Sequence, residues 1–111
     1  MKMNITEQKN TTVLHVQGSL DADSIQAFKK TAYPLVEKGC SRLVLDCSAL
    51  SFVDSMGLGV LISLLRKLRA NQGDLKVVAM NADVRSIFEI TRLHRLFDCC
   101  NNLEEAFNRF A

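Results

Sequence analysis

The sequence lacks the long apolar run that a membrane-spanning helix needs. Its most apolar stretch, Met56 to Leu65, ends at basic residues after about half of the roughly 20 residues required. The polar segment of residues 1–12 contains no apolar core like that of a secretory signal peptide. We therefore expect a cytoplasmic protein with reduced thiols and no membrane partner.

The sequence also shows no excess of one charge and no pattern of metal ligands. Its 14 Lys and Arg residues stand against 12 Asp and Glu residues, which argues against a nucleic-acid partner. The four cysteines form no C-x-x-C pair, and neither histidine lies at ligand spacing from them, so we predict no metal and no organic cofactor. Cys40 and Cys47 are expected to be small buried residues flanking a strand, whereas a redox role for the adjacent Cys99 and Cys100 stays open.

Internal repeats, low-complexity segments and enzyme motifs are missing as well. With 111 residues, 48% of them hydrophobic, the chain predicts one folded domain over residues 1–111. There is no G-x-x-x-x-G-K-[ST] loop and no G-x-S-x-G turn around Ser55, and Gly57-Leu58-Gly59 lacks the third glycine of a dinucleotide-binding motif. We therefore predict a protein that is not an enzyme and has no catalytic residues.

Patterns typical of strands and helices alternate along the chain. Strands are predicted at residues 3–8, 12–17, 42–47 and 75–80, with a short edge strand near 96–99. Helices are predicted at about residues 25–38, 55–68, 82–91 and 103–110, and the second has a broad apolar surface that indicates a buried helix. This order predicts an α/β domain with a mixed sheet of four to five strands packed against about four helices.

Several residues give local signals for where these elements begin, bend or end. Gly18 is expected to end the second strand, and a capping box is expected at Asp23 to Gln26. Pro34 is expected to kink or split the first helix because proline removes a helical hydrogen bond. Capping is also predicted at Asn81 and at Asn102, the latter as a capping box with Glu105.

The most informative segment is Leu50 to Gly59, where a buried strand gives way to a buried helix. The first amide groups of a helix favour a phosphate, so Ser55 is placed as a phosphoryl acceptor, and Gly57 and Gly59 leave space for another molecule to approach. A purely structural interpretation is open at this point. Asp54 is a preferred N-cap residue, and the glycines could serve only to pack the helix on the sheet.

The hexapeptide Asp54 to Gly59 resembles the D-S-[ST]-G-[LIV]-G phosphorylation loop of STAS-domain anti-sigma factor antagonists. The resemblance extends to Gly18-Ser19-Leu20-Asp21, similar to the family's G-x-L-D turn, to the strand at residues 42–46, and to residues 84–97 near the C-terminus. These segments occur in the family's order over nearly the whole chain. The resemblance therefore implies a STAS-type fold.

The resemblance also implies a role in bacterial signal transduction and transcription regulation. An antagonist of this family binds an anti-sigma factor that has a GHKL-type serine kinase fold, is released when the kinase phosphorylates its serine, and is reset by a PP2C-type phosphatase. Here the phosphorylated residue would be Ser55. The partner-binding residues would be Asp21, Asp54, Ser55, Met56, Gly57, Leu58 and Gly59. Met56 departs from the family's Ser or Thr, which removes a second hydroxyl and adds an apolar side chain.

Three alternatives remain open from the sequence. The protein could regulate secretion, motility or biofilm formation through another partner, or it could be a non-phosphorylated subunit of a transport or lipid-trafficking complex. The third alternative, an enzyme built around Ser55, lacks a positioned base because nothing ties His15 or His94 to the loop.

Overall fold

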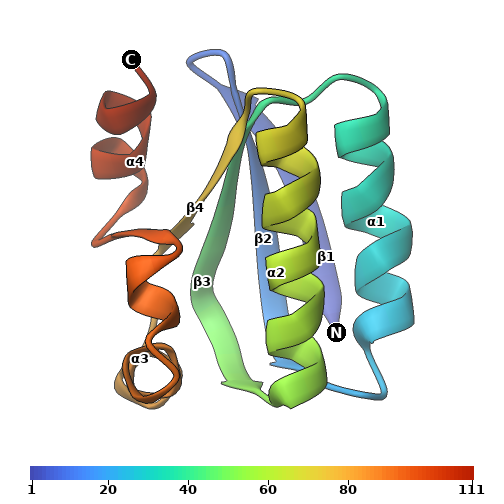
Figure 1. Cartoon of the computed structure of the whole chain (residues 1–111), viewed down its shortest axis with the longest axis vertical. Coiled ribbons are helices and arrows are strands. Elements are labelled where there is room, and N and C mark those ends of the chain that lie inside the picture. The colour runs from blue at the N-terminus through green and yellow to red at the C-terminus, as the bar shows by residue number, and fades with distance from the viewer.

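The computed structural model describes all 111 residues and contains five strands and four α-helices (Figure 1). This confirms the predicted α/β class and the predicted order of elements. In chain order the elements are β1 (Lys2–Gln8), β2 (Thr11–Leu20), α1 (Ile25–Glu37), β3 (Arg42–Val53), α2 (Ser55–Ala70), β4 (Asp74–Val78), α3 (Ala82–Ile90), the short 3-10 helix η1 (Leu93–Arg95), β5 (Asp98–Cys100) and α4 (Leu103–Phe110).

The strands form one mixed sheet in the order β1-β2-β3-β4-β5. β1 and β2 are an antiparallel hairpin, turning at Lys9 and Asn10, which both have the positive φ that a tight two-residue turn requires. The other neighbouring pairs are parallel, with helices in the connections. Because β2, β3 and β4 run parallel, their carboxyl ends meet at one edge of the sheet.

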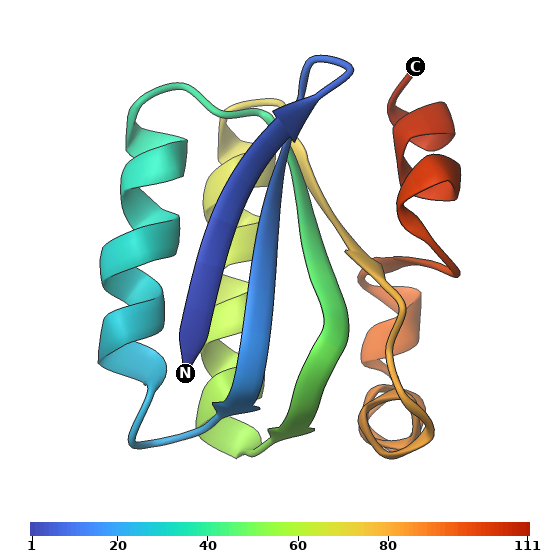
Figure 2. The ribbon, with the colours of Figure 1, turned by 180° about the vertical axis from the view of Figure 1, so that it is seen from behind.

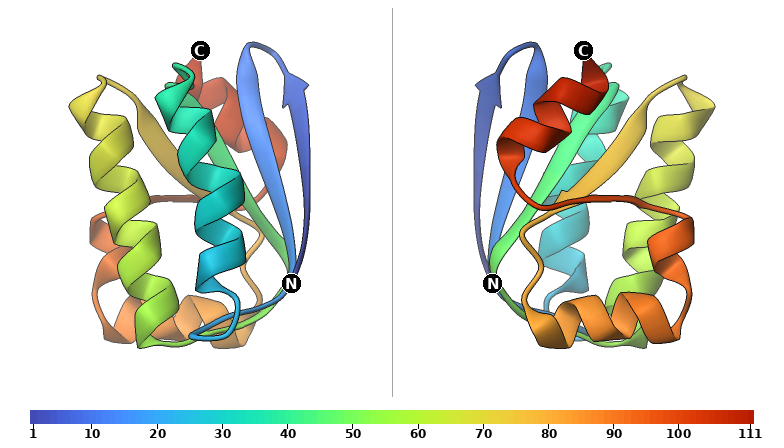
Figure 3. Two further views of the ribbon diagram at one scale, coloured as in Figure 1. Left: turned by 90° about the vertical axis from the view of Figure 1, so that its right-hand side faces the viewer. Right: turned by 90° about the vertical axis from the view of Figure 1, so that its left-hand side faces the viewer.

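The two faces of the sheet are covered unequally. α1 and α2 lie side by side over one face, where 24 buried residues form the main hydrophobic cluster (Figure 1). α4 packs on the other face through a separate cluster of six residues that includes Val44 and Phe107. Seen from that side, β1, β2 and much of β3 are uncovered (Figure 2). The side views in Figure 3 show α2 packed along the sheet, ending near the turn to β4.

The second helix is buried as its sequence predicts. Leu61, Leu64, Leu65 and Leu68 on α2 are at most 1% exposed. Their packing fixes α2, and therefore its first residue, Ser55, against the sheet. No helix in the structure has the length and apolar character that crossing a membrane would require.

The strand boundaries differ from those predicted. β2 does not end at Gly18: it passes through this residue, which has a φ of 105°, and continues to Leu20. β3 likewise runs to Val53 instead of Cys47, with irregular pairing to β2 near its end. Both strands therefore extend to the edge where α2 begins.

The first helix differs from the prediction in two respects. Pro34 does not split the helix: it lies in the last turn, and α1 continues to Glu37. The capping box is absent: Ser24 is the N-cap residue, but its hydroxyl donates to the Ser19 carbonyl at 2.7 Å and accepts from the Asp21 amide at 3.0 Å. The side chain of Ser24 thus ties α1 to the end of β2.

The other caps follow the prediction more closely. The side-chain Oδ1 of Asn81 accepts from the Val84 amide at 2.8 Å, and the side-chain Oδ1 of Asn102 accepts from the Glu105 amide at 2.9 Å. The Glu105 carboxylate reaches the Asn101 amide instead of completing the box at Asn102. Of the first two cysteines, Cys47 is buried within β3, and Cys40 is only half-buried.

Candidate functional site

Asp54 joins the two chain segments that meet at the carboxyl edge of the sheet. It is the N-cap of α2, and its Oδ1 accepts from the Gly57 amide at 2.8 Å. Its Oδ2 accepts from the Ala22 amide at 3.2 Å, and its own amide donates to the Leu20 carbonyl at 3.2 Å. One side chain therefore fixes both the start of the helix and the turn that follows β2.

Asp21 shapes that neighbouring turn. Its carbonyl accepts from the amides of Ser24 and Ile25 at 3.1 and 3.0 Å, and its carboxylate accepts from the Asp23 amide at 3.0 Å. The turn thus lies beside the start of α2 and is bonded to it through Asp54. Three carboxylates, those of Asp21, Asp23 and Asp54, gather at this end of the molecule.

Gly57 is required by packing. A Cβ at this position would lie 2.3 Å from the Leu20 carbonyl oxygen and 2.9 Å from Val53 Cγ1. The structural interpretation therefore holds for Asp54 and Gly57, which bring α2 close to β2 and β3. Leu58 is also an interior residue, only 8% exposed within the main cluster.

Ser55, Met56 and Gly59 differ from these residues because they are exposed. Ser55 is the first residue of α2, and its hydroxyl takes no part in the side-chain hydrogen bonds that hold the loop. Met56 is 51% exposed, and a Cβ at Gly59 would have nothing within 4 Å. The positive end of the helix lies beside the free hydroxyl, which is a suitable place for a phosphate.

Phe52 is a surface residue that the sequence interpretation missed. It lies on the last part of β3, is 49% exposed, and precedes Ser55 by three positions, so two large apolar side chains, Phe52 and Met56, border the serine along the chain. The signal was the alternation of Phe52 with the buried Val53. It went unused because β3 was expected to end at Cys47.

Neither histidine contacts the Ser55 loop. The His15 ring lies between two side chains of neighbouring strands, with Nδ1 at 2.7 Å from Asp46 Oδ2 and Nε2 at 2.9 Å from Thr6 Oγ1. His94 Nδ1 lies 3.3 Å from the Phe88 carbonyl oxygen. Ser55 therefore has no histidine base within the chain.

The cysteines give no sign of a reactive thiol. All four are free, and burial raises the pKa values of the Cys47, Cys99 and Cys100 thiols, which disfavours the reactive thiolate. The chain has no group of three or more His, Cys, Asp or Glu side chains arranged to hold a metal ion.

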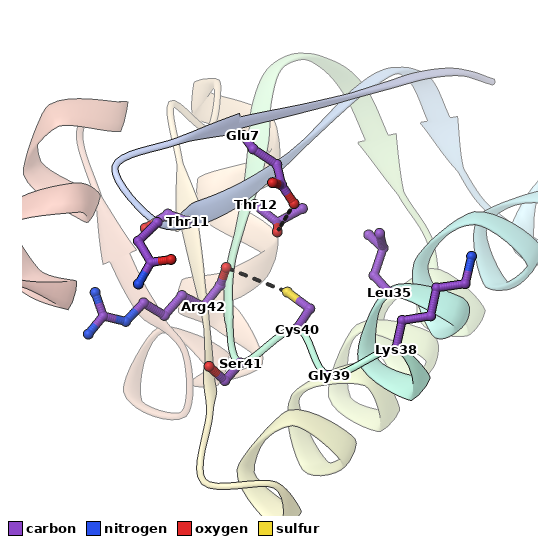
Figure 4. A pocket seen from close by; sticks show the side chains of 10 residues that line it. Glu7, Thr11, Thr12, Leu35, Lys38, Gly39, Cys40, Ser41 and Arg42 are labelled. Carbon is purple, nitrogen blue, oxygen red and sulfur yellow. Dashed lines mark hydrogen bonds between the residues drawn. The ribbon is translucent and has the colours of Figure 1, made fainter.

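A cavity of about 400 Å³ lies at the opposite end of the sheet, between the β1–β2 hairpin and the start of β3 (Figure 4). Thr12 Oγ1 donates to Glu7 Oε1 at 3.3 Å inside it. The side chains of Lys38 and Arg42 point away from each other, so its positive charges do not converge on one ligand (Figure 4). No buried side-chain nitrogen or oxygen atom of the chain lacks a hydrogen-bond partner, so this cavity contains no buried polar group aimed at a ligand.

The chain matches known proteins over almost its whole length. A family model described as the STAS domain matches residues 2–106. BtrV of Bordetella bronchiseptica, whose name describes an anti-sigma factor antagonist, is 28% identical over 110 residues, which cover 99% of this chain and 95% of BtrV.

Solved structures show the same fold. An anti-sigma factor antagonist from Thermotoga maritima superimposes with a TM-score of 0.92 at 22% identity, covering 96% of this chain and 92% of that protein. The phosphorylated form of the Bacillus cell fate determinant SpoIIAA gives a TM-score of 0.75 at 21% identity, covering 99% of this chain and all of that one.

Proposed function

This chain belongs to the STAS domain family, and we propose that it is a cytoplasmic anti-sigma factor antagonist whose partner binding is turned off by phosphorylation of Ser55. The observation that carries the proposal is the exposed Ser55 hydroxyl at the N-terminus of α2, next to a loop that Asp54 and Gly57 otherwise hold in place. BtrV, matched over 95% of its length, is named as an anti-sigma factor antagonist, and SpoIIAA, which shares the fold, has a phosphorylated form.

The partner we propose is an anti-sigma factor with a GHKL-type serine kinase fold. It binds the unphosphorylated antagonist and transfers a phosphoryl group from ATP to Ser55, and a PP2C-type phosphatase removes that group. ATP belongs to the kinase and the metal to the phosphatase, so this chain supplies only the acceptor hydroxyl and the docking surface. Neither histidine of this chain contacts the Ser55 loop, which agrees with this division.

Phosphorylation would act on the interface and leave the fold intact. A phosphoserine adds a charge of roughly −1.5 to −2 at neutral pH. The start of α2 tolerates this charge because its free amides and its dipole are positive. A partner docked over Ser55 would meet a hydrated dianion beside the carboxylate of Asp54, and binding would be lost.

The test is affinity purification of the wild-type chain and of Ser55→Ala and Ser55→Asp from the native host, with mass spectrometry of the co-purified proteins and of Ser55. We expect a kinase-fold ATPase with wild type and Ser55→Ala and its loss with Ser55→Asp. Ser41→Asp, an exposed serine at the opposite end of the sheet, is the matched control and should keep the partner. Recovery of the same partners with all four proteins would refute the switch and indicate a constitutive subunit.

A further inference from the structure

A groove runs between α1 and α2 and includes Met56, the residue that follows Ser55. We call it the α1–α2 groove; its volume is about 240 Å³, and it is lined by Ile25, Lys29 and Tyr33 of α1 and by Met56, Gly59, Val60 and Ser63 of α2. Each set recurs at the three- and four-residue spacing that places side chains on one face of a helix. The far end is closed where the Tyr33 hydroxyl donates to Ser63 Oγ at 3.1 Å.

Gly59 in this groove has no explanation within the chain. It lies in the interior of α2, where glycine is less favourable than alanine because it costs more backbone entropy. Gly57 repays this cost by allowing close packing, but a Cβ at Gly59 would meet nothing within 4 Å, and its φ is not positive. The missing side chain therefore leaves space outside the chain, in the α1–α2 groove.

We propose that the α1–α2 groove receives an apolar side chain of the same anti-sigma factor that docks over Ser55, with Gly59 as the point of closest approach. This inference rests on the proposed function and extends its interface. The exposed Met56 provides the main apolar contact, beside the largely buried Ile25 and Val60, and Lys29 is the one charged residue of the lining. The inserted partner segment is therefore apolar and carries a carboxylate that faces Lys29.

The position of Ser55 explains how one phosphate closes the groove. Ser55 and Gly59 are four residues apart on α2 and thus lie on the same face, one turn from each other. A phosphate on Ser55 places its charge at the entrance through which the apolar partner side chain enters. Met56, which stands where the family has Ser or Thr, widens the apolar rim and selects among related partners.

The experiment fills the groove without touching Ser55. Gly59→Ala and Gly59→Leu are compared with Ala70→Leu, which adds a similar side chain to an exposed position at the far end of α2. Thermal unfolding and the affinity for the purified kinase-fold protein recovered with wild type are measured for each variant. We expect Gly59→Ala to have a higher Tm than wild type, and Gly59→Leu to bind at least ten-fold more weakly, whereas Ala70→Leu binds as wild type does.

The failure of this inference is distinguishable from failure of the switch. If Gly59→Leu binds like Ala70→Leu while Ser55→Asp loses the partner, the switch stands and the groove is not part of the interface. If wild type forms a dimer that Gly59→Leu abolishes, with kinase binding unchanged, the groove holds a second copy of the chain and our assignment is wrong. If wild type recovers no kinase-fold protein, both proposals fall.

Discussion

The two faces of the sheet differ in the kind of contact that covers them: one is apolar, and the other is largely ionic. On the face under α1 and α2, contacts are apolar, and the 24-residue cluster contains no charged side chain. On the other face, α4 packs through a cluster of only six apolar residues, two of them its own. The surroundings are ionic: Lys76 lies 2.8 Å from Asp98 and 3.4 Å from Asp74, and His15 pairs with Asp46. Ser55 belongs to a helix of the first face, so the position of the candidate switch depends on the apolar face and on the Asp54 cap, and not on the ionic face.

This difference shows which face can hold a residue in place when that residue gains a charge. A switch residue has to stay in place when it gains charge, and a helix packed on a large apolar core provides such a fixed point. The ionic face has fewer apolar contacts, and the carboxylates of Asp74 and Asp98 stay partly exposed, which weakens their ion pairs with Lys76. Single substitutions on each face should therefore lower stability by different amounts, most on the apolar face.

The largest expected effect is on the apolar face. Leu61→Ala should lower the free energy of unfolding by roughly 2 to 5 kcal/mol, because Leu61 is 1% exposed and its removal leaves a cavity. Urea denaturation followed by circular dichroism measures this loss. The half-buried Ile62, the next residue on α2, is the control and should lose less when changed to alanine. A loss below about 0.5 kcal/mol at Leu61 would contradict the dominance of this face.

A smaller loss is expected where α2 touches the strand ends. Gly57→Ala should cost about 1 to 3 kcal/mol, because the added Cβ collides with the Leu20 carbonyl and the backbone has to move. Gly59→Ala, two residues away on the same helix, should instead add up to about 1 kcal/mol. The two variants are compared by thermal unfolding. Equal effects at both glycines would show that the space around them does not decide their roles.

On the ionic face we expect about 1 to 2 kcal/mol for Lys76→Met, which leaves the carboxylates of Asp74 and Asp98 without their shared ammonium group. The loss stays moderate because Asp98 keeps Arg109 and Asp74 keeps Arg69, although the cation–π contact of the Lys76 ammonium with the Phe110 ring is lost as well. Urea denaturation at low and high salt is the measurement. A loss as large as that of Leu61→Ala would mean that the two faces contribute equally.

The order of elements could be predicted from the sequence because each segment has its own periodicity. The buried run Leu43-Val44-Leu45 and the broad apolar stripe of α2 need no knowledge of the rest of the chain. The end of β3 could not be predicted in this way, because Asp46 and Ser48 interrupt the apolar pattern. Beyond them the strand continues because it pairs with β2, which the residue types of β3 do not reveal. Gly18 was wrongly predicted to end β2, because the pairing of Gly18 with Leu50 of β3 continues the strand.

The candidate site was predictable in part. Ser55 and Asp54 follow from their place before an apolar helix, and the resemblance strengthened that interpretation. The separate roles of Gly57 and Gly59 could not be predicted, since only the distance to the Leu20 carbonyl distinguishes them. The contact between His15 and Asp46 joins residues 31 positions apart and has no local signal.

The smallest expected effect concerns stability in acid, which depends on two carboxyl groups of the ionic face, Asp46 and Asp98. Burial raises the pKa of Asp46, but hydrogen bonds from the Ser48 amide and from His15 outweigh it, and the net pKa lies below its ordinary value. Burial also raises the pKa of Asp98, but the hydrogen bonds and charges of Lys76 and Arg109 outweigh it, so this pKa is lowered as well. A lowered carboxyl pKa stabilises the fold above the ordinary carboxyl range, and this stabilisation is lost as the pH falls through the lowered pKa.

Asp46→Asn should therefore lose less stability than wild type between about pH 5 and about pH 3, a range below the ordinary histidine pKa. Urea denaturation at each pH measures the slope, with the exposed Asp83→Asn as the control expected to follow wild type. If the free energy of unfolding of Asp46→Asn falls with pH as steeply as that of wild type, the His15 contact does not lower the pKa of Asp46 in the folded protein. In that case the acid sensitivity would rest on the Lys76, Asp98 and Arg109 group, and Asp98→Asn would flatten the slope instead.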